Sequence, residues 1–267
     1  MNMSLYILLY VGLPLLGVIL AVYSIKSRYD ETMRDIKMEL NWEKKYTKSK
    51  GKFFVFCTLE LTPVVYGLTC ICLIYAGMQH GVTGSVAERI ALAGGIIIGV
   101  SGFSTIIGSD LIICEAMKHV PRDPYIDIPT RIFMSTKEQR EFYKKHADIF
   151  KEWTFGKYMC LSTLPHTVSI FGLVLTILIF SFSGMLGSKT ALTITQSNIH
   201  YLAVISYIFA VSSIGGILSG YLPARVKGEI KESKVFSRKI ISGVIGHLPT
   251  LFGLAICIYL MARYGML

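Results

Sequence analysis

The chain contains 267 residues, of which 52% are hydrophobic and only 16% are charged. Soluble globular domains contain about 25% charged residues, so the composition argues against a soluble enzyme and favours an integral membrane protein. The formal net charge of +10 is concentrated in a few segments that separate long apolar blocks. We therefore expect the lipid bilayer, and no nucleic acid, as a partner.

Six blocks of the chain are apolar enough to cross a bilayer, for which a helix needs roughly 20 apolar residues. The third and fifth blocks contain glycine, serine and threonine, which let membrane helices pack closely. The first block has no preceding positive charge and no small-x-small cleavage site, so we expect a retained helix and not a signal peptide. The sequence predicts an all-α, polytopic membrane protein with six transmembrane helices at Leu5–Ser24, Phe53–Met78, Ile90–Cys114, Tyr158–Met185, Tyr201–Leu222 and Ile240–Met261.

The spacing of the blocks predicts three helical hairpins. Long, basic loops join the two helices within each hairpin, whereas the connections between hairpins are shorter and mostly uncharged. The expected hairpins are 1–79 with the loop 25–52, 80–185 with the loop 118–157, and 186–267 with the loop 223–239.

The lysines and arginines predict the orientation of the chain. Of the 27, 24 lie within 26–52, 118–157 and 225–239. The positive-inside rule places these loops in the cytoplasm and both termini on the opposite side of the membrane. The segments 29–48 and 137–153 mix charged and apolar residues without proline. They are either helical extensions or surface helices that dock a soluble partner, or solvated charged loops.

The second helix of each hairpin contains a similar phrase, in which proline precedes an aromatic–Gly–Leu triplet and an apolar run. Internal repetition of this kind indicates a repeated structural unit. The triplets are Tyr66-Gly67-Leu68, Phe171-Gly172-Leu173 and Phe252-Gly253-Leu254. The first helix of the second hairpin is rich in glycine. We expect close helix packing at Pro63, Gly67, Gly102, Gly108, Gly172 and Gly253.

Four titratable side chains fall inside the predicted spans, where a charged group costs several kcal/mol unless it is paired or protonated. They are Glu60, Asp110, His166 and His247, and each lies eight or nine residues from a lysine near the loop boundary. That separation is about 12–14 Å along a helix. Four helices thus place an ionisable group in one layer, which predicts an ion- or proton-binding site. The alternative is a set of polar groups that hydrogen-bond the helices together.

Pro63 lies three residues after Glu60 on the same helix. A proline leaves the carbonyl one turn earlier without its helical donor. We expect that carbonyl to serve as an ion ligand or as a hydrogen-bond acceptor.

These phrases resemble the proteolipid subunit (subunit c, also called K) of rotary ATPases, above all of the V/A type. In that family the second helix of a hairpin reads Glu-x-x-x-aliphatic-Tyr-Gly-Leu before an apolar run. The first helix is glycine-rich and often ends in Glu-Ala-Ile-Ala-Arg-x-Pro, which the segment from Glu115 to Arg122 resembles. The resemblance implies a subunit of an oligomeric membrane ring that contacts other ring subunits and the ATPase stalk and stator. It implies proton or sodium translocation, with the ATPase activity on partner subunits.

The position of the family carboxylate is occupied differently in this chain. In the family it lies six residues before the glycine, where this chain has Leu61, His166 and His247, while Glu60 stands one residue earlier. One residue turns a side chain about 100° around a helix. Either Glu60 alone carries the ion, or the histidines have changed the chemistry, or the chain is a structural subunit without ion transport.

Two further hypotheses do not need a ring. In a stand-alone cation or proton transporter, all four titratable groups would converge in one site, and repeated hairpins also occur in transporters. In a haem- or metal-binding protein, His166 and His247 would be the ligands. The sequence shows no catalytic motif of a soluble enzyme, and its six cysteines show neither zinc nor disulfide spacing. We therefore expect no enzymatic activity, metal or cofactor in the chain itself.

Overall fold

The computed structural model describes residues 3–36, 42–79, 84–120, 141, 154–186, 194 and 198–267. These residues form helices and no strand, and six helical spans are long and apolar enough to cross a membrane. The predicted fold class, an all-α polytopic membrane protein, is therefore confirmed. The spans are Leu5–Asp35, Lys50–Met78, Gly84–His119, Phe155–Phe182, Tyr201–Arg225 and Ser233–Arg263.

Most spans consist of two helices that meet inside the membrane. The helices are α1 (Met3–Ile7), the π-helical η1 (Leu8–Gly12), α2 (Leu13–Ile36), α3 (Trp42–Leu59), α4 (Thr62–Gln79), α5 (Gly84–His119), α8 (Phe155–Thr163), α9 (His166–Phe182), α10 (Tyr201–Ser212), α11 (Ile214–Arg225), α12 (Ser233–Gly246) and α13 (Leu248–Arg263).

The segments that join the two helices of a hairpin contain more helix than the loops predicted from their basic residues. Helix α2 continues to Ile36 and α3 begins at Trp42, so most of the predicted loop 25–52 is helical extension. The predicted loop 223–239 is wrong at both ends, because only 226–232 lies between α11 and α12. Most of the loop 118–157, including 137–140 and 142–153, lies outside the described residues.

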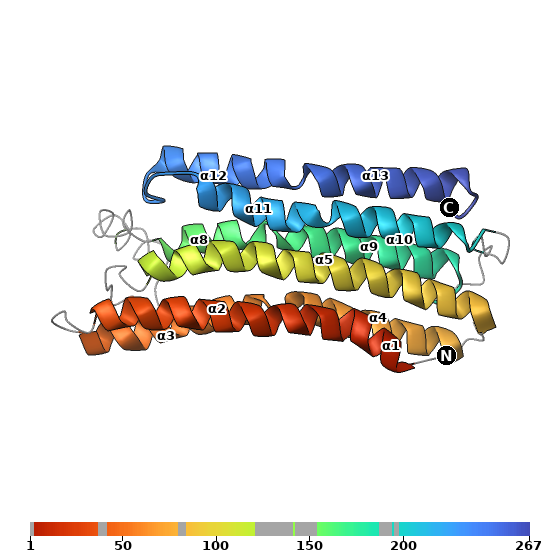
Figure 1. Cartoon of the computed structure of the whole chain (residues 1–267), viewed down its shortest axis with the longest axis horizontal. Coiled ribbons are helices and arrows are strands. Elements are labelled where there is room, and N and C mark those ends of the chain that lie inside the picture. The colour runs from red at the N-terminus through yellow and green to blue at the C-terminus, as the bar shows by residue number, and fades with distance from the viewer. Residues whose placement is uncertain are drawn as a thin grey trace.

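The three hairpins lie side by side in the order of the sequence (Figure 1). Helix α5 occupies the centre, with α2 on one side, α10 and α11 on the other, and α8 and α9 as its own hairpin partners. The first helices of the hairpins thus form a continuous row, whereas the second helices touch one another much less. Both termini lie at one end of the bundle, which we call the terminal end, and we call the opposite end the loop end.

Prolines explain three of the helix breaks. The second, fourth and sixth spans are interrupted next to Pro63, Pro165 and Pro249, because proline has no N–H to continue the helical hydrogen bonds. The fifth span breaks at Ser213 without a proline, just before Gly215 and Gly216. By contrast, α5 is unbroken over 36 residues, a length of about 54 Å.

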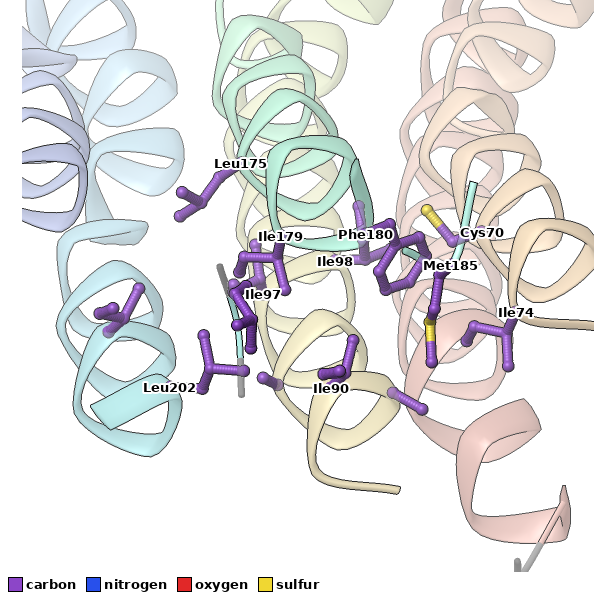
Figure 2. Packing of buried hydrophobic residues seen from close by; sticks show 14 of the residues in the cluster. Cys70, Ile74, Ile90, Ile97, Ile98, Leu175, Ile179, Phe180, Met185 and Leu202 are labelled. Atoms are coloured by element: carbon purple, nitrogen blue, oxygen red, sulfur yellow. The ribbon is translucent and has the colours of Figure 1, made fainter. Parts of the chain in front are cut away.

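Two apolar clusters fill the bundle. The cluster toward the terminal end joins all three hairpins through residues such as Ile97, Phe180 and Leu202, and Figure 2 shows part of it. The cluster toward the loop end includes Phe56 and Ile113. In the second and fourth spans, the break falls between buried members of the two clusters. We call the buried polar residues at this level the central polar layer: Glu60, Ser104, Thr105, Ser109, His166, Ser213, His247 and Thr250.

Hydrogen bonds between helices hold the breaks at one level of the bundle. The Thr105 hydroxyl of α5 donates to the Pro165 carbonyl at 3.1 Å, and the Ser104 hydroxyl donates to the Ser213 carbonyl. The Thr250 hydroxyl donates to the Ser212 carbonyl at 2.8 Å. These bonds supply donors at points where the helical ladder is interrupted.

Candidate functional site

Glu60 is the most unusual residue of the central polar layer. It lies in the turn between α3 and α4 and is fully buried, with a relative exposure of 0%. Neither carboxyl oxygen has a hydrogen-bond partner among the described residues. A buried polar group without a partner costs about 1–3 kcal/mol, and more when it is charged. Such a residue needs a functional explanation.

Glu60 faces the central helix α5. Ser109 and Asp110 of α5 are close enough to act on its carboxyl group, although the Ser109 hydroxyl does not reach it with ordinary hydrogen-bond geometry. The structure therefore brings together two of the four titratable residues predicted from the sequence.

Asp110 differs from Glu60 in having partners. It accepts a hydrogen bond from the Cys114 thiol at 3.2 Å, and the Ser24 hydroxyl of α2 lies 3.1 Å from the Cys114 sulfur. Asp110 is also only partly buried. Asp110 therefore has a hydrogen-bond partner for its carboxyl group, whereas Glu60 has none among the described residues.

The carbonyl that Pro63 leaves without its helical donor accepts a side-chain hydrogen bond. Pro63 deprives the Leu59 carbonyl of its usual donor, and the Thr62 hydroxyl donates to that carbonyl at 2.8 Å. Of the two expected roles, the structure shows the hydrogen-bond acceptor.

The two histidines lie at the helix breaks of the second and third hairpins. His247, in the break between α12 and α13, has its Nε2 atom 3.1 Å from the hydroxyl of Thr167 in α9. His166, the neighbour of Thr167, is 5% exposed, and neither ring nitrogen has a hydrogen-bond partner among the described residues. His247 is thus hydrogen-bonded to the neighbouring hairpin, whereas His166 is buried without a hydrogen-bond partner among the described residues.

The four predicted residues are therefore arranged along the row of hairpins. Glu60 and Asp110 face each other between the first and second hairpins, whereas His247 pairs with Thr167 between the second and third. In the part of the chain that the structure describes, no three His, Cys, Asp or Glu side chains are grouped to hold a metal ion. Among the described residues, no hydrogen bond of these side chains links the carboxyl groups to the histidines.

The repeated glycines contact the first helix of their own hairpin. A Cβ atom on Gly67 would overlap with the Tyr10 carbonyl, and on Gly172 or Gly253 with the hydroxyl of Ser101 or Ser212. The three aromatic–Gly–Leu triplets are therefore equivalent in the structure as well as in the sequence. Gly102 packs against Pro14 and Pro63, and Gly108 against Gly216 and Gly220 of the third hairpin.

Two residues at the site were missed from the sequence. Ser109 and Thr167 face the carboxylate and histidine sites, but serine and threonine in a glycine-rich helix indicate packing as readily as a site. Lys239 was assigned to a loop by its charge. The structure instead buries it in α12, where its ammonium group donates to the Pro223 carbonyl at 2.8 Å.

No protein-family model matches the chain, and no match was found among curated proteins or solved structures. The functional argument therefore rests on the geometry of the site.

Proposed function

We propose that this chain is a proton-translocating membrane subunit in which Glu60 carries the proton. The main support for this proposal is the environment of Glu60. Its carboxyl group is fully buried in the middle of a span and has no hydrogen-bond partner among the described residues. A protonated carboxyl is neutral and tolerates this enclosure, whereas a carboxylate does not. Glu60 thus holds a proton while it is buried.

Release of the proton requires that Glu60 meets water or a positive charge. The helix is already interrupted at Glu60 and Leu61, between α3 and α4, and sharp bends in membrane helices occur at such proline-associated breaks. Alternation between the enclosed and exposed positions would move one proton.

The surroundings of Glu60 favour a proton over a metal cation. Hard cations require several oxygen ligands at once. Neither Glu60 oxygen has a hydrogen-bond partner among the described residues, and the Leu59 carbonyl already accepts from Thr62. A proton needs one carboxyl group and no ligand shell.

The arrangement of the hairpins supports a role within a larger assembly. The first helices of the hairpins form a continuous row, and Glu60 with Asp110 and His247 with Thr167 lie at successive hairpin boundaries. A row of similar units presents different faces at its two ends, and such head-to-tail interfaces close into rings. Together with the sequence resemblance, this favours a divergent proteolipid subunit of a V/A-type ATPase ring over a stand-alone transporter.

The test is purification of the tagged chain from its native membranes in mild detergent, followed by identification of the proteins that accompany it. We expect the catalytic, stalk and stator subunits of a rotary ATPase. Recovery of the chain alone or as a small homo-oligomer, with the ATPase intact in other fractions, would overturn the ring assignment and favour the transporter. A visible absorption spectrum of the same sample tests the haem hypothesis.

A further inference from the structure

An apolar groove runs along the membrane face between α5 and α10 at the terminal end of the bundle. It has a volume of about 460 Å³, within the range of ligand pockets. Its walls consist mainly of small and aliphatic side chains, and they include Leu92, Ala93, Ile96, Leu202, Ala203 and Ala210. The central polar layer does not contribute to it, so this site is separate from that of Glu60.

The basic groups of the groove lie at one end, and Ser206 and Tyr207 add polar atoms farther along it. Arg89 of α5 and His200, just before α10, line this end, and both are exposed. Arg89 forms no ion pair with a described residue. Its neighbour Glu88 interacts with Tyr6 of α1, whose hydroxyl donates to the Glu88 backbone carbonyl at 3.4 Å.

The length of the groove matches one leaflet of a bilayer. From His200 to Ala210 the chain advances about 15 Å along a helix. The hydrocarbon core of a bilayer is about 30 Å thick, so one leaflet accounts for about 15 Å. A molecule in this groove would place its charged group beside Arg89 and its apolar part against α5 and α10.

The shape of the groove distinguishes a lipid chain from a protein helix. Helices α5 and α10 are in contact, and the valley between two packed helices admits a flexible hydrocarbon chain. A helix is 10–12 Å across with its side chains and would rest on the rim of the valley. The guanidinium group of Arg89 matches a phosphate in shape and charge.

We propose that the groove between α5 and α10 is a binding site for an anionic glycerophospholipid, with the headgroup phosphate at Arg89 and His200 and an acyl chain along Leu92, Ala93 and Ala203. The inference does not depend on the proton-carrying role of Glu60.

The test measures the binding of phosphatidylglycerol and phosphatidylcholine to the purified, delipidated full chain in detergent by native mass spectrometry. We expect phosphatidylglycerol to bind more tightly than phosphatidylcholine. Arg89→Ala should weaken phosphatidylglycerol binding about fivefold, because one basic residue near a lipid headgroup contributes a factor of that order. Arg89→Lys should retain much of the preference.

Two further variants distinguish the groove from general attraction to lipid. Arg263→Ala removes another exposed arginine at the terminal end, outside the groove, and should leave binding unchanged. Ala203→Phe fills the groove from an exposed position and should weaken the binding of both lipids. Equal losses in Arg89→Ala and Arg263→Ala, or unchanged binding in Ala203→Phe, would overturn the proposal. Thermal melting of each variant in the same detergent verifies that the fold is retained.

Discussion

Between the first and second hairpins an acidic residue occupies the helix break, whereas between the second and third hairpins a histidine occupies it. Glu60 is buried against Ser109 and Asp110 without a hydrogen bond, while His247 is bonded to Thr167. Both breaks are associated with proline, and both are followed by an aromatic–Gly–Leu triplet that packs on the first helix of the hairpin. The comparison shows how one repeated framework holds different chemistry at equivalent places.

The largest expected effect comes from Glu60→Gln. Glutamine has nearly the same size as glutamic acid but cannot release a proton, so we expect ATP-driven acidification of membrane vesicles to be abolished. A hydrophobic carbodiimide, which reacts with protonated carboxyl groups, should label Glu60 in the unmodified chain, as read by peptide mass spectrometry.

Two controls accompany this variant. Glu88→Gln removes an exposed glutamate near the terminal end, and His247→Gln changes the histidine boundary. Both should retain acidification. Full activity in Glu60→Gln would refute the assignment of Glu60, and a loss in His247→Gln equal to that in Glu60→Gln would remove the difference between the two boundaries.

The next largest effect is expected for Gly67→Ala, which tests the packing of the first hairpin. The added methyl group would meet the Tyr10 carbonyl, and backbone atoms cannot turn away as a side chain can. We expect a loss of about 3 kcal/mol in the free energy of unfolding, measured by unfolding in mixed micelles. Gly51→Ala, where a Cβ meets nothing within 4 Å, is the matched control. Equal stability of the two variants would contradict the close approach of the first two helices.

A smaller effect is expected for the equivalent change in the second hairpin, Gly172→Ala. Here the added methyl group meets the Ser101 hydroxyl, which is a side-chain group. We expect a loss of about 1–2 kcal/mol, of which Ser101→Ala should restore more than half in the double variant. The same unfolding measurement checks this. Absence of any rescue would show that the backbone, as in the first hairpin, limits the approach.

The smallest effect concerns the histidine boundary. Thr167→Val removes the hydroxyl that bonds His247 while retaining the shape of the side chain. Hydrogen bonds between membrane helices contribute about 0.6 kcal/mol on average, and we expect a loss of that size in the free energy of unfolding. In a double-mutant cycle with His247→Phe, the two changes should be less than additive. Full additivity would mean that the two side chains do not interact.

Much of the architecture was predictable from the sequence. Apolar blocks such as Phe53–Met78 fix the spans because a bilayer admits only helices of sufficient length. The three prolines and three aromatic–Gly–Leu triplets indicated a repeated hairpin before any contact was known. Charge was a weaker guide to the loops. Lys239 counted as a loop residue, but its ammonium group reaches the Pro223 carbonyl from within α12.

The candidate site was predictable only as a layer. Counting residues from the loop lysines placed Glu60, Asp110, His166 and His247 at similar depths, because the rise per residue of a helix is constant. Depth does not determine direction around the helix axis or the neighbour that a side chain meets. The pairing of Glu60 with α5 and of His247 with Thr167 depends on how the hairpins pack.

The sequence by itself thus determined the spans, their grouping in hairpins and the level of the titratable residues, since these follow from the period of one helix and the thickness of a bilayer. Tertiary structure alone decided that Glu60 is enclosed against α5 without a hydrogen-bond partner among the described residues. It also decided that an apolar groove ends at Arg89 and His200. These features depend on contacts between helices distant in the chain, and each contact forms only when small residues such as Gly67 and Gly108 let the helices approach.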